Sequence, residues 1–224
     1  MTTIEQAKKA AGQKAAQLVL DGMIVGLGTG TTAYWFIHSL IPLCKKINIQ
    51  AVATSSASLE QARKGGIPLL DVNTITSIDI TVDGADEIDP ERRMIKGGGG
   101  ALLKEKIIAS MSKEVIVIID ETKLVPKLGK CKLPVEIVPF GVQSTIHKLE
   151  QQGFSGTLRK DKNGIYKTEN GNYIYDIHLD PNKTHPAEDH ERLIQIPGVI
   201  ETGFFLNLAT QVIVGFLDGT VRLT

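Results

Sequence analysis

The stretch Met23-Ile24-Val25-Gly26-Leu27-Gly28-Thr29-Gly30-Thr31-Thr32 decides the fold. Its first five residues form a short, mostly apolar run that is typical of a buried strand, and a loop with two glycines, Gly28 and Gly30, follows. Residues 32–41 have the pattern of a helix, which Pro42 is expected to end. The order strand, glycine loop, helix predicts the start of an α/β fold, in which loop N–H groups and threonine hydroxyls can bind a phosphate.

Strands and helices alternate on both sides of this stretch, up to about Asp120. A helix is expected before it, at Ile4–Leu20. After it we expect strands at Ile49–Ala53, Leu69–Leu70, Ile78–Val82 and Val115–Ile119, and helices at Ser58–Lys64 and Ala101–Ser112. This alternation predicts an α/β protein with a Rossmann-like, doubly wound and mostly parallel sheet.

The pattern changes near Leu133, where a second unit is expected. A strand, a helix at 142–152, a hairpin region ending in a strand at 173–179, a helix at 187–194 and a strand at 199–200 predict a smaller α+β, ferredoxin-like unit. Residues 211–217 and 221–223 are expected to form a hairpin at one edge of the large sheet. The predicted division is a Rossmann-like catalytic domain of residues 1–130 plus 205–224, and a ferredoxin-like domain of residues 131–204.

The composition excludes several classes of function. The 224 residues contain 25 Lys plus Arg and 25 Asp plus Glu, so no overall charge favours binding to nucleic acid or to a membrane surface. The first residues lack the apolar core of a signal peptide and no apolar run reaches membrane-spanning length, so a soluble, cytoplasmic protein is expected. Cys44 and Cys131 are far apart and match no disulfide or zinc pattern.

A second informative segment begins at the end of the strand at 78–82. Asp83 and Asp86 follow that strand directly, at the edge where open α/β sheets bind ligands. Lys96 then precedes four glycines, whose N–H groups allow an anion to approach closely, and a helix opens near Ala101. An acid, a cation and an anion-binding loop in one segment predict an active site.

Other interpretations of these motifs remain open from the residues alone. The first glycine loop lacks the lysine of a P-loop, and residues 46–56 contain no acid for the ribose of NAD, which favours a small phosphorylated ligand. A plain structural turn is the alternative. The carboxylates at 83, 86, 87 and 89 could form a metal site, although the neighbouring Lys96 would compete for their oxygens. The four glycines could be a hinge, and Glu105 could be an exposed helix carboxylate.

These motifs together resemble the ribose-5-phosphate isomerase family of the A type. The resemblance runs nearly end to end and is carried by Val25–Thr32, Asp83–Glu87, Lys96–Gly99, Glu105–Ala109, Asp120–Lys123 and Leu133–Glu136. It implies interconversion of ribose 5-phosphate and ribulose 5-phosphate in the pentose phosphate pathway, without a metal or organic cofactor. It also implies a Rossmann-like domain with a ferredoxin-like lid, in a homodimer or a homotetramer.

The resemblance also implies a role for each matched residue. Glu105 would be the general base that moves a proton between C2 and C1, and Lys96 would stabilise the enediolate oxygen. Asp83 and Asp86 would hold the sugar hydroxyls, with Asp83 the better candidate for opening the ring. The implied substrate-binding residues are Thr29, Gly30, Thr31, Thr32, Gly84, Ala85, Gly97, Gly98, Gly99, Lys123 and Lys8. Such a reaction needs a base removed from water and a stabilised enediolate, because a carbon acid beside a carbonyl is weak.

Two rival functions use a similar scaffold. A glucosamine-6-phosphate deaminase would need a histidine for ring opening, which these motifs lack. A coenzyme A transferase would need a nucleophilic glutamate, and nothing marks one apart from Glu105. A sugar-phosphate sensor from a different functional class would need an output module such as a helix-turn-helix, and none is recognisable here. The presence of both Lys96 and Glu105 favours catalysis over binding alone.

Overall fold

The computed structural model describes residues 3–223, which pack as two units. The first unit contains the chain up to Ala85, Lys104–Leu124 and the chain from Leu208; the second contains Asp86–Leu103 and Val125–Asn207. These bounds differ from the predicted domains, 1–130 plus 205–224 and 131–204, because residues 86–103, 125–130 and 205–207 pack with the second unit. The chain therefore changes from one unit to the other after Ala85 and again after Leu103, within the two segments of the predicted active site.

A six-stranded sheet forms the centre of the first unit. Its elements are α1 (Thr3–Ala16), β1 (Ile24–Leu27), α2 (Thr31–Leu43), β2 (Gln50–Ala53), α3 (Ser56–Lys64), the 3-10 helix η1 (Val72–Thr74), β3 (Ile78–Asp83), α4 (Leu102–Ser110), β6 (Ser112–Asp120), the 3-10 helix η2 (Glu121–Lys123), β14 (Gln211–Gly215) and β15 (Val221–Leu223). The strand order is β15-β14-β6-β3-β1-β2, and only β15 runs antiparallel to its neighbour. The predicted doubly wound, mostly parallel sheet and its terminal edge hairpin are confirmed.

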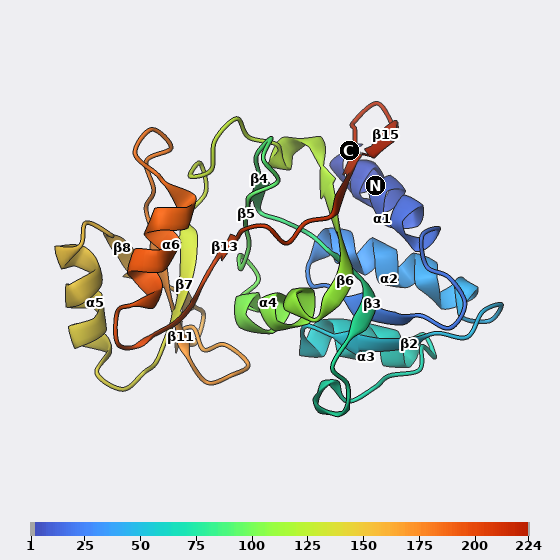
Figure 1. Cartoon of the computed structure of the whole chain (residues 1–224), viewed down its shortest axis with the longest axis horizontal. Coiled ribbons are helices and arrows are strands. Elements are labelled where there is room, and N and C mark those ends of the chain that lie inside the picture. Colours follow the sequence, from blue (N-terminus) through green and yellow to red (C-terminus); the bar gives the residue numbers. More distant parts are fainter. Residues whose placement is uncertain (1–2, 224) are drawn as a thin grey trace. The chain divides into compact units, whose positions relative to one another are not determined.

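Helices cover both faces of this sheet, as the continuous apolar character of its strands requires. Figure 1 shows α1 and α2 on one side of β6 and α4 on the other. Phe36 and Leu40 of α2 are fully buried in one core with Val25 and Val82 of the sheet. Ile108 of α4 packs in a separate cluster with Val52 and Ile78. The two clusters fix the helices against the strands whose ends carry the predicted site.

Two local expectations for the first unit were wrong. Pro42 does not end its helix, because α2 continues to Leu43 and the Cys44 N–H still donates to the Leu40 carbonyl at 3.0 Å. A proline in the last turn removes only one hydrogen bond, so the helix tolerates it. Residues 69–70 form no strand; Leu69 makes a single isolated bridge with Ala51.

The second unit contains a four-stranded antiparallel sheet with two helices. Its elements are β4 (Glu87–Ile88), β5 (Met94–Ile95), β7 (Leu133–Ile137), α5 (Val142–Gln151), β8 (Gly156–Leu158), β9 (Lys160–Asp161), β10 (Gly164–Ile165), β11 (Tyr173–Ile177), α6 (Pro186–Ile194), β12 (Val199–Thr202) and β13 (Phe204–Phe205). The four-stranded order is β12-β7-β11-β8, with α5 after β7 and α6 after β11. This is the strand, helix, strand, strand, helix, strand arrangement that the sequence predicts for a ferredoxin-like unit.

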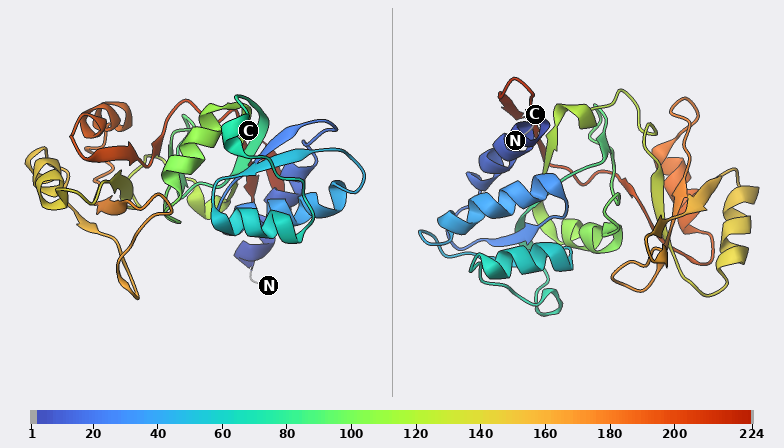
Figure 2. Two further views of the ribbon diagram at one scale, coloured as in Figure 1. Left: turned by 90° about the horizontal axis from the view of Figure 1, so that it is seen from below. Right: turned by 180° about the vertical axis from the view of Figure 1, so that it is seen from behind.

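Residues alternate between the two faces of this smaller sheet. Val135 of β7 and Tyr175 of β11 are paired in register and pack in one core with Leu149 of α5 and Leu193 of α6. Asp176, the next residue of β11, therefore lies on the opposite face. The hairpin of β9 and β10, drawn in orange in Figure 2, projects from this sheet.

A three-stranded sheet of very short strands completes the second unit. Its order is β13-β5-β4, with Phe204 opposite Ile95 and Ile95 opposite Glu87. Two-residue strands leave no periodic pattern, so the sequence did not predict this sheet. It fixes the backbone directly before Lys96.

Candidate active site

Asp83 lies at the carboxyl end of β3, beside the end of β1, where the strand order of the large sheet reverses. Its buried Oδ1 accepts hydrogen bonds from the N–H groups of Thr29 (3.0 Å) and Gly84 (2.7 Å). A Cβ at Gly28 would lie 2.2 Å from this oxygen. Only glycine therefore fits at position 28, and its absent side chain lets the first glycine loop approach the carboxylate. This is the place in an α/β sheet where ligands bind.

A cluster of hydroxyl groups holds the first glycine loop against α3. The Thr29 hydroxyl lies 2.6 Å from the Thr54 hydroxyl and donates to the Ser55 hydroxyl at 2.8 Å. The Ser58 hydroxyl donates to the Gly28 carbonyl at 2.5 Å. Both the N–H and the hydroxyl of Thr29 are thus used inside the protein. Thr54, Ser55 and Ser58 belong to no recognisable motif and were not predicted from the sequence.

The N-terminus of α2 brings together several of the predicted phosphate-binding residues. The exposed Thr31 hydroxyl accepts a hydrogen bond from Lys8 Nζ at 2.9 Å, and the same ammonium lies 3.9 Å from the buried Asp120 Oδ2. Gly30, with φ near 105°, precedes the helix and provides no side-chain cap for its first N–H groups. A helix start with uncapped N–H groups and an adjacent cation attracts anions.

A cavity of about 1080 Å³ opens beside this helix end. Lys8, Thr29, Gly30 and Thr31 line one part of it, together with side chains of α2 and α3. The Thr32 side chain is buried within α2. Lys123 is half-buried in η2, which begins where the Asp120 carboxylate accepts the Thr122 N–H at 3.1 Å. Asp120 thereby connects η2 with the cation at Lys8.

Glu105 stands in the first turn of α4, and its side chain is only 5% exposed. The interpretation as an exposed surface carboxylate is therefore wrong, although the flanking Lys104 and Lys106 made it reasonable from spacing alone. Burial removes the carboxylate from bulk water.

Lys96 directly follows β5 and is also 5% exposed. Its N–H donates to the Gly203 carbonyl at 2.9 Å, and its Nζ lies 5.3 Å from the centroid of the Phe205 ring. The face of an aromatic ring attracts a cation, so Phe205 stabilises a buried ammonium at this position.

The second glycine loop, Gly97–Gly100, is a closed turn. The Gly100 N–H donates to the Gly97 carbonyl at 2.9 Å, and both residues have positive φ. Asp86 Oδ2 accepts the Gly98 N–H at 2.7 Å, where a Cβ on Gly98 would lie 2.7 Å from Asp86 Oδ1. These hydrogen bonds show that the loop is not a free hinge.

The other two carboxylates of this segment serve the protein structure. Glu87 is buried and accepts the N–H groups of Gly129, at 2.8 Å, and of Cys131. Burial, together with the Glu87 charge, raises the pKa of the Cys131 thiol. Asp89 Oδ2 binds Arg93 at 2.7 Å. The alternative metal cluster would have to include these two engaged side chains.

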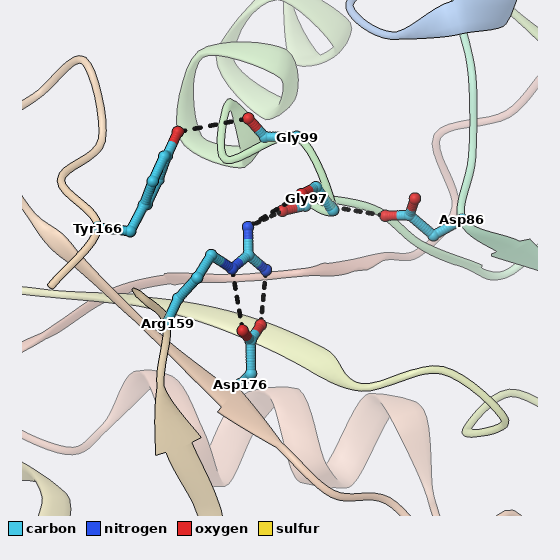
Figure 3. A network of polar contacts seen from close by, with 7 residues as sticks. Asp86, Gly97, Gly99, Arg159, Tyr166 and Asp176 are labelled. Atoms are coloured by element: carbon cyan, nitrogen blue, oxygen red, sulfur yellow. Dashed lines mark hydrogen bonds and ion pairs between the residues drawn. The ribbon is translucent and has the colours of Figure 1, made fainter. Parts of the chain in front are cut away.

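Three further residues hold the second glycine loop, and no motif in the sequence marks them (Figure 3). Arg159 forms two hydrogen bonds with Asp176, and its Nη1 donates to the carbonyls of Gly97 at 2.9 Å and Gly98 at 3.1 Å. The Tyr166 hydroxyl lies 3.4 Å from the Gly99 carbonyl. They come from segments more than 60 residues later in the chain, so no local pattern connects them to the loop.

The predicted residues fall into two sets, one in each unit. The first unit holds Asp83, Gly84, Ala85, Glu105, Lys123, Lys8 and the loop Thr29–Thr32; the second holds Asp86, Lys96 and Gly97–Gly99. Within 3–223, no helix is both long and apolar enough to cross a membrane.

Comparison with known proteins shows which family this chain matches over most of its length. Residues 50–219 match the family described as ribose 5-phosphate isomerase A (phosphoriboisomerase A). Ribose-5-phosphate isomerase A of Protochlamydia amoebophila is 50% identical over 220 residues, which cover 97% of this chain and 95% of that protein. The solved ribose 5-phosphate isomerase of Plasmodium falciparum is 36% identical, with a TM-score of 0.94 and 98% of each chain covered. A D-ribose-5-phosphate isomerase solved in complex with phospho-erythronic acid is 37% identical, with a TM-score of 0.94, and 99% of this chain and 98% of that chain are covered.

Proposed function

The chain belongs to the ribose 5-phosphate isomerase A family, and on this premise we propose how its residues act on the substrate. The protein is an aldose–ketose isomerase that interconverts ribose 5-phosphate and ribulose 5-phosphate. The reaction moves a proton between two neighbouring carbons, C2 and C1, and passes through an enediolate. The protein must therefore supply a base, a stabiliser of the oxyanion and a grip on the phosphate.

Glu105 is the proposed base. Its carboxylate takes the proton from C2 of the open-chain aldose; the electrons of the C–H bond form the C1–C2 double bond, and the carbonyl oxygen becomes negative. The O2 hydroxyl proton passes to the negative O1, and Asp83 is its proposed carrier. The same carboxylic acid then returns the proton taken from C2 to C1, which yields the ketose. The burial of the Glu105 side chain supports this role. It is the single observation on which the assignment mainly depends.

Lys96 is the proposed stabiliser of the enediolate oxygen. Its ammonium is buried, so its charge acts in a medium that screens it less than water does. Gly97, Gly98 and Gly99 are proposed to bring backbone groups to the substrate beside it. The closed turn of the second glycine loop supports this, because fixed N–H groups need no reorganisation during the reaction.

Asp83 and Asp86 are proposed to bind the sugar hydroxyls, and Asp83 to help open the ring and carry the hydroxyl proton. Each carboxylate already accepts a loop N–H through one oxygen, which fixes its orientation toward a hydroxyl. Gly84 and Ala85 lie between them in the chain and are proposed substrate contacts through their backbone.

The phosphate is proposed to bind at the start of α2. The hydroxyls of Thr31 and Thr32, the backbone of Thr29 and Gly30, and the ammonium groups of Lys8 and Lys123 would surround it. The Lys8–Thr31 hydrogen bond and the uncapped helix end support this assignment. No metal or organic cofactor is proposed for any step.

The ligand of one solved relative offers a probe for this chain. Phospho-erythronic acid, which that isomerase binds, joins a phosphate to a planar carboxylate. A planar carboxylate resembles the enediolate in shape and charge, so we expect it to inhibit this enzyme in competition with ribose 5-phosphate.

The decisive experiment measures ribulose 5-phosphate formation from ribose 5-phosphate in the presence of a chelator, for the wild type and for Glu105→Gln. We expect the wild type to keep its activity and the variant to lose about 10³-fold in kcat. Glu191→Gln, on an exposed carboxylate of α6, is the matched control and should keep full activity. An active Glu105→Gln variant, or a folded wild type that binds ribose 5-phosphate without turnover, would overturn the proposal; the second result would favour a sensor.

We further propose a cytoplasmic homodimer. Cys44 and Cys131 are both free thiols, as is usual in a reducing compartment. Phe140 is 92% exposed, and we propose that the second subunit covers it. Light scattering of the purified protein would distinguish the dimer from a tetramer or a monomer.

A further inference from the structure

We propose that Arg159 is a positioning residue of the isomerase: through the carbonyl oxygens of Gly97 and Gly98 it fixes the second glycine loop and strengthens the Gly99 N–H as a donor to the substrate. This inference rests on the proposed function, because it assumes that the loop beside Lys96 faces the developing oxyanion. Figure 3 shows the guanidinium between Asp176 and the loop.

Asp176 fixes the orientation of the Arg159 guanidinium. Nε donates to Asp176 Oδ2 at 2.9 Å and Nη2 donates to Oδ1 at 2.6 Å, while the side chains are only 17% and 12% exposed. The rigid planar fork then directs Nη1 at the two glycine carbonyls, at 2.9 and 3.1 Å. A lysine ammonium has no such fixed geometry and could not satisfy both partners at once.

The backbone around Arg159 makes this support rigid. The Arg159 N–H donates to the Ile174 carbonyl of β11 at 2.8 Å, and its carbonyl accepts the Tyr166 N–H at 2.9 Å. Tyr166 reaches the loop as well: a Cβ on Gly100 would lie 2.2 Å from its hydroxyl oxygen. The Arg159 Cζ lies 5.8 Å from the Tyr166 ring centroid. One hairpin therefore presents two side chains to the same loop.

The chemical effect follows from the geometry of the peptide group. In a trans peptide the N–H points away from the carbonyl, so holding the carbonyls of residues 97 and 98 also fixes the directions of the Gly98 and Gly99 N–H groups. The Gly98 N–H donates to Asp86. The Gly99 N–H takes part in none of the hydrogen bonds found within residues 3–223 and can meet a ligand. A cation on the Gly98 carbonyl polarises that peptide and makes the Gly99 N–H a stronger donor.

The second unit also contains a matched arginine that does not touch the loop. Arg192 pairs with Asp189 at 3.4 Å, donates to the Gln152 carbonyl at 2.7 Å and lies 4.7 Å from the Phe154 ring centroid. It thus has the same kinds of partner as Arg159, an aspartate, a carbonyl and an aromatic ring. Replacing Arg192 therefore measures how much the loss of an arginine lowers the stability of this unit when the second glycine loop is not touched.

The test compares Arg159→Met with Arg192→Met in kcat, KM, the inhibition constant of phospho-erythronic acid and the melting temperature. We expect Arg159→Met to lower kcat by about 30-fold, with KM changed by less than about threefold, because the loop acts on the oxyanion and not on the phosphate. Inhibition by phospho-erythronic acid should weaken by a similar factor. Arg192→Met should leave kcat within about twofold at a comparable melting temperature.

Two further variants keep the proposal testable. Arg159→Lys should retain the charge and still lose most of the kcat, and Asp176→Asn, which keeps the side-chain shape, should fall between wild type and Arg159→Met. Wild-type kcat in Arg159→Met, or a loss matched by Arg192→Met, would overturn the inference. If Glu105→Gln is inactive while Arg159→Met is normal, only this inference fails; if Glu105→Gln is active, the proposed function fails first.

Discussion

The two glycine loops, Gly28–Thr31 and Gly97–Gly100, use the same device in different surroundings. In each, an aspartate accepts a loop N–H at a place where a glycine leaves room: Asp83 beside Gly28, and Asp86 beside Gly98. The first loop continues into α2, a helix of 13 residues packed on the large sheet. The second loop is a short turn after a two-residue strand.

The difference lies in what holds each loop from behind. Hydroxyls from the next strand and helix hold the first loop, all within about 30 residues of it. Side chains more than 60 residues later hold the second. We infer that the first loop is part of the packed core of its unit, whereas the second depends on the Arg159–Asp176 ion pair and on Tyr166. Mutations at the first loop should therefore lower the stability of the protein, and mutations at the second should mainly lower its activity.

The largest expected effect compares the two close-approach glycines. In Gly28→Ala the new Cβ would lie 2.2 Å from the Asp83 Oδ1 and 2.5 Å from the Asp83 Cα, a backbone atom that cannot move aside. We expect a loss of about 3 kcal/mol in the free energy of unfolding and the loss of nearly all activity. Urea unfolding and kcat measurements test this.

Gly98→Ala should behave differently, because its Cβ would meet only the Asp86 side chain. We expect a loss of less than about 1 kcal/mol in stability and a fall of about 10-fold in kcat. Gly66→Ala, where φ is +74° and the space is open, controls for backbone strain alone at about 1 kcal/mol. Equal destabilisation by the first two substitutions would contradict the contrast between the loops.

Smaller effects are expected for two threonines of the first loop, Thr29, which supports the structure, and Thr31, which is proposed to bind phosphate. Thr29→Val removes a hydroxyl that two neighbouring hydroxyls use, so we expect about 2 kcal/mol less stability. Thr31→Val removes an exposed hydroxyl and should raise KM by about 10-fold, with stability changed by less than about 0.5 kcal/mol. Thermal unfolding and steady-state kinetics on both variants check this; an unchanged KM in Thr31→Val would remove that residue from the phosphate site.

The smallest effect is expected for a substitution of Asp79 in β3, which contacts the start of β1, the end that lies away from the first loop. Asp79 accepts the Ile24 N–H at 2.8 Å and pairs with Lys113 at 2.7 Å, and the hydrogen bond from Lys113 lowers the pKa of its carboxyl. A lowered folded-state pKa adds stability above the unfolded pKa of about 3.9, and this stability is lost as the pH falls through the folded value.

Asp79→Asn should therefore lose up to about 1 kcal/mol at pH 7, and the difference from wild type should shrink below about pH 4. The kcat should not change, because the substitution lies at the opposite end of β1 and β3 from Asp83. Denaturant unfolding of both proteins at pH 7 and pH 3 measures the difference in their free energies of unfolding. A difference that grows at low pH would show that the carboxylate destabilises the folded state.

Much of this molecule could be predicted because its informative signals are local. The apolar run before Gly28 and the acids after β3 marked the strand ends, and the alternation of strands and helices gave both units. The prediction that Pro42 ends its helix was wrong because Pro42 lies in the last turn of α2. A proline there removes only one hydrogen bond, so the helix can continue past it. The strands β4, β5 and β13 are too short to show a period, so their sheet and the boundary at residue 86 were missed.

The sequence by itself determined the family, the order of elements and the residue types that carry the chemistry, because these depend on periodicity and on contiguous motifs. Only the tertiary structure decided that Glu105 is buried, that the Thr29 hydroxyl serves the loop, and that Arg159 and Asp176 hold the second glycine loop. Burial and long-range hydrogen bonds depend on which distant segments pack together. One arginine in a polar segment carries no local mark of the carbonyls that it will meet.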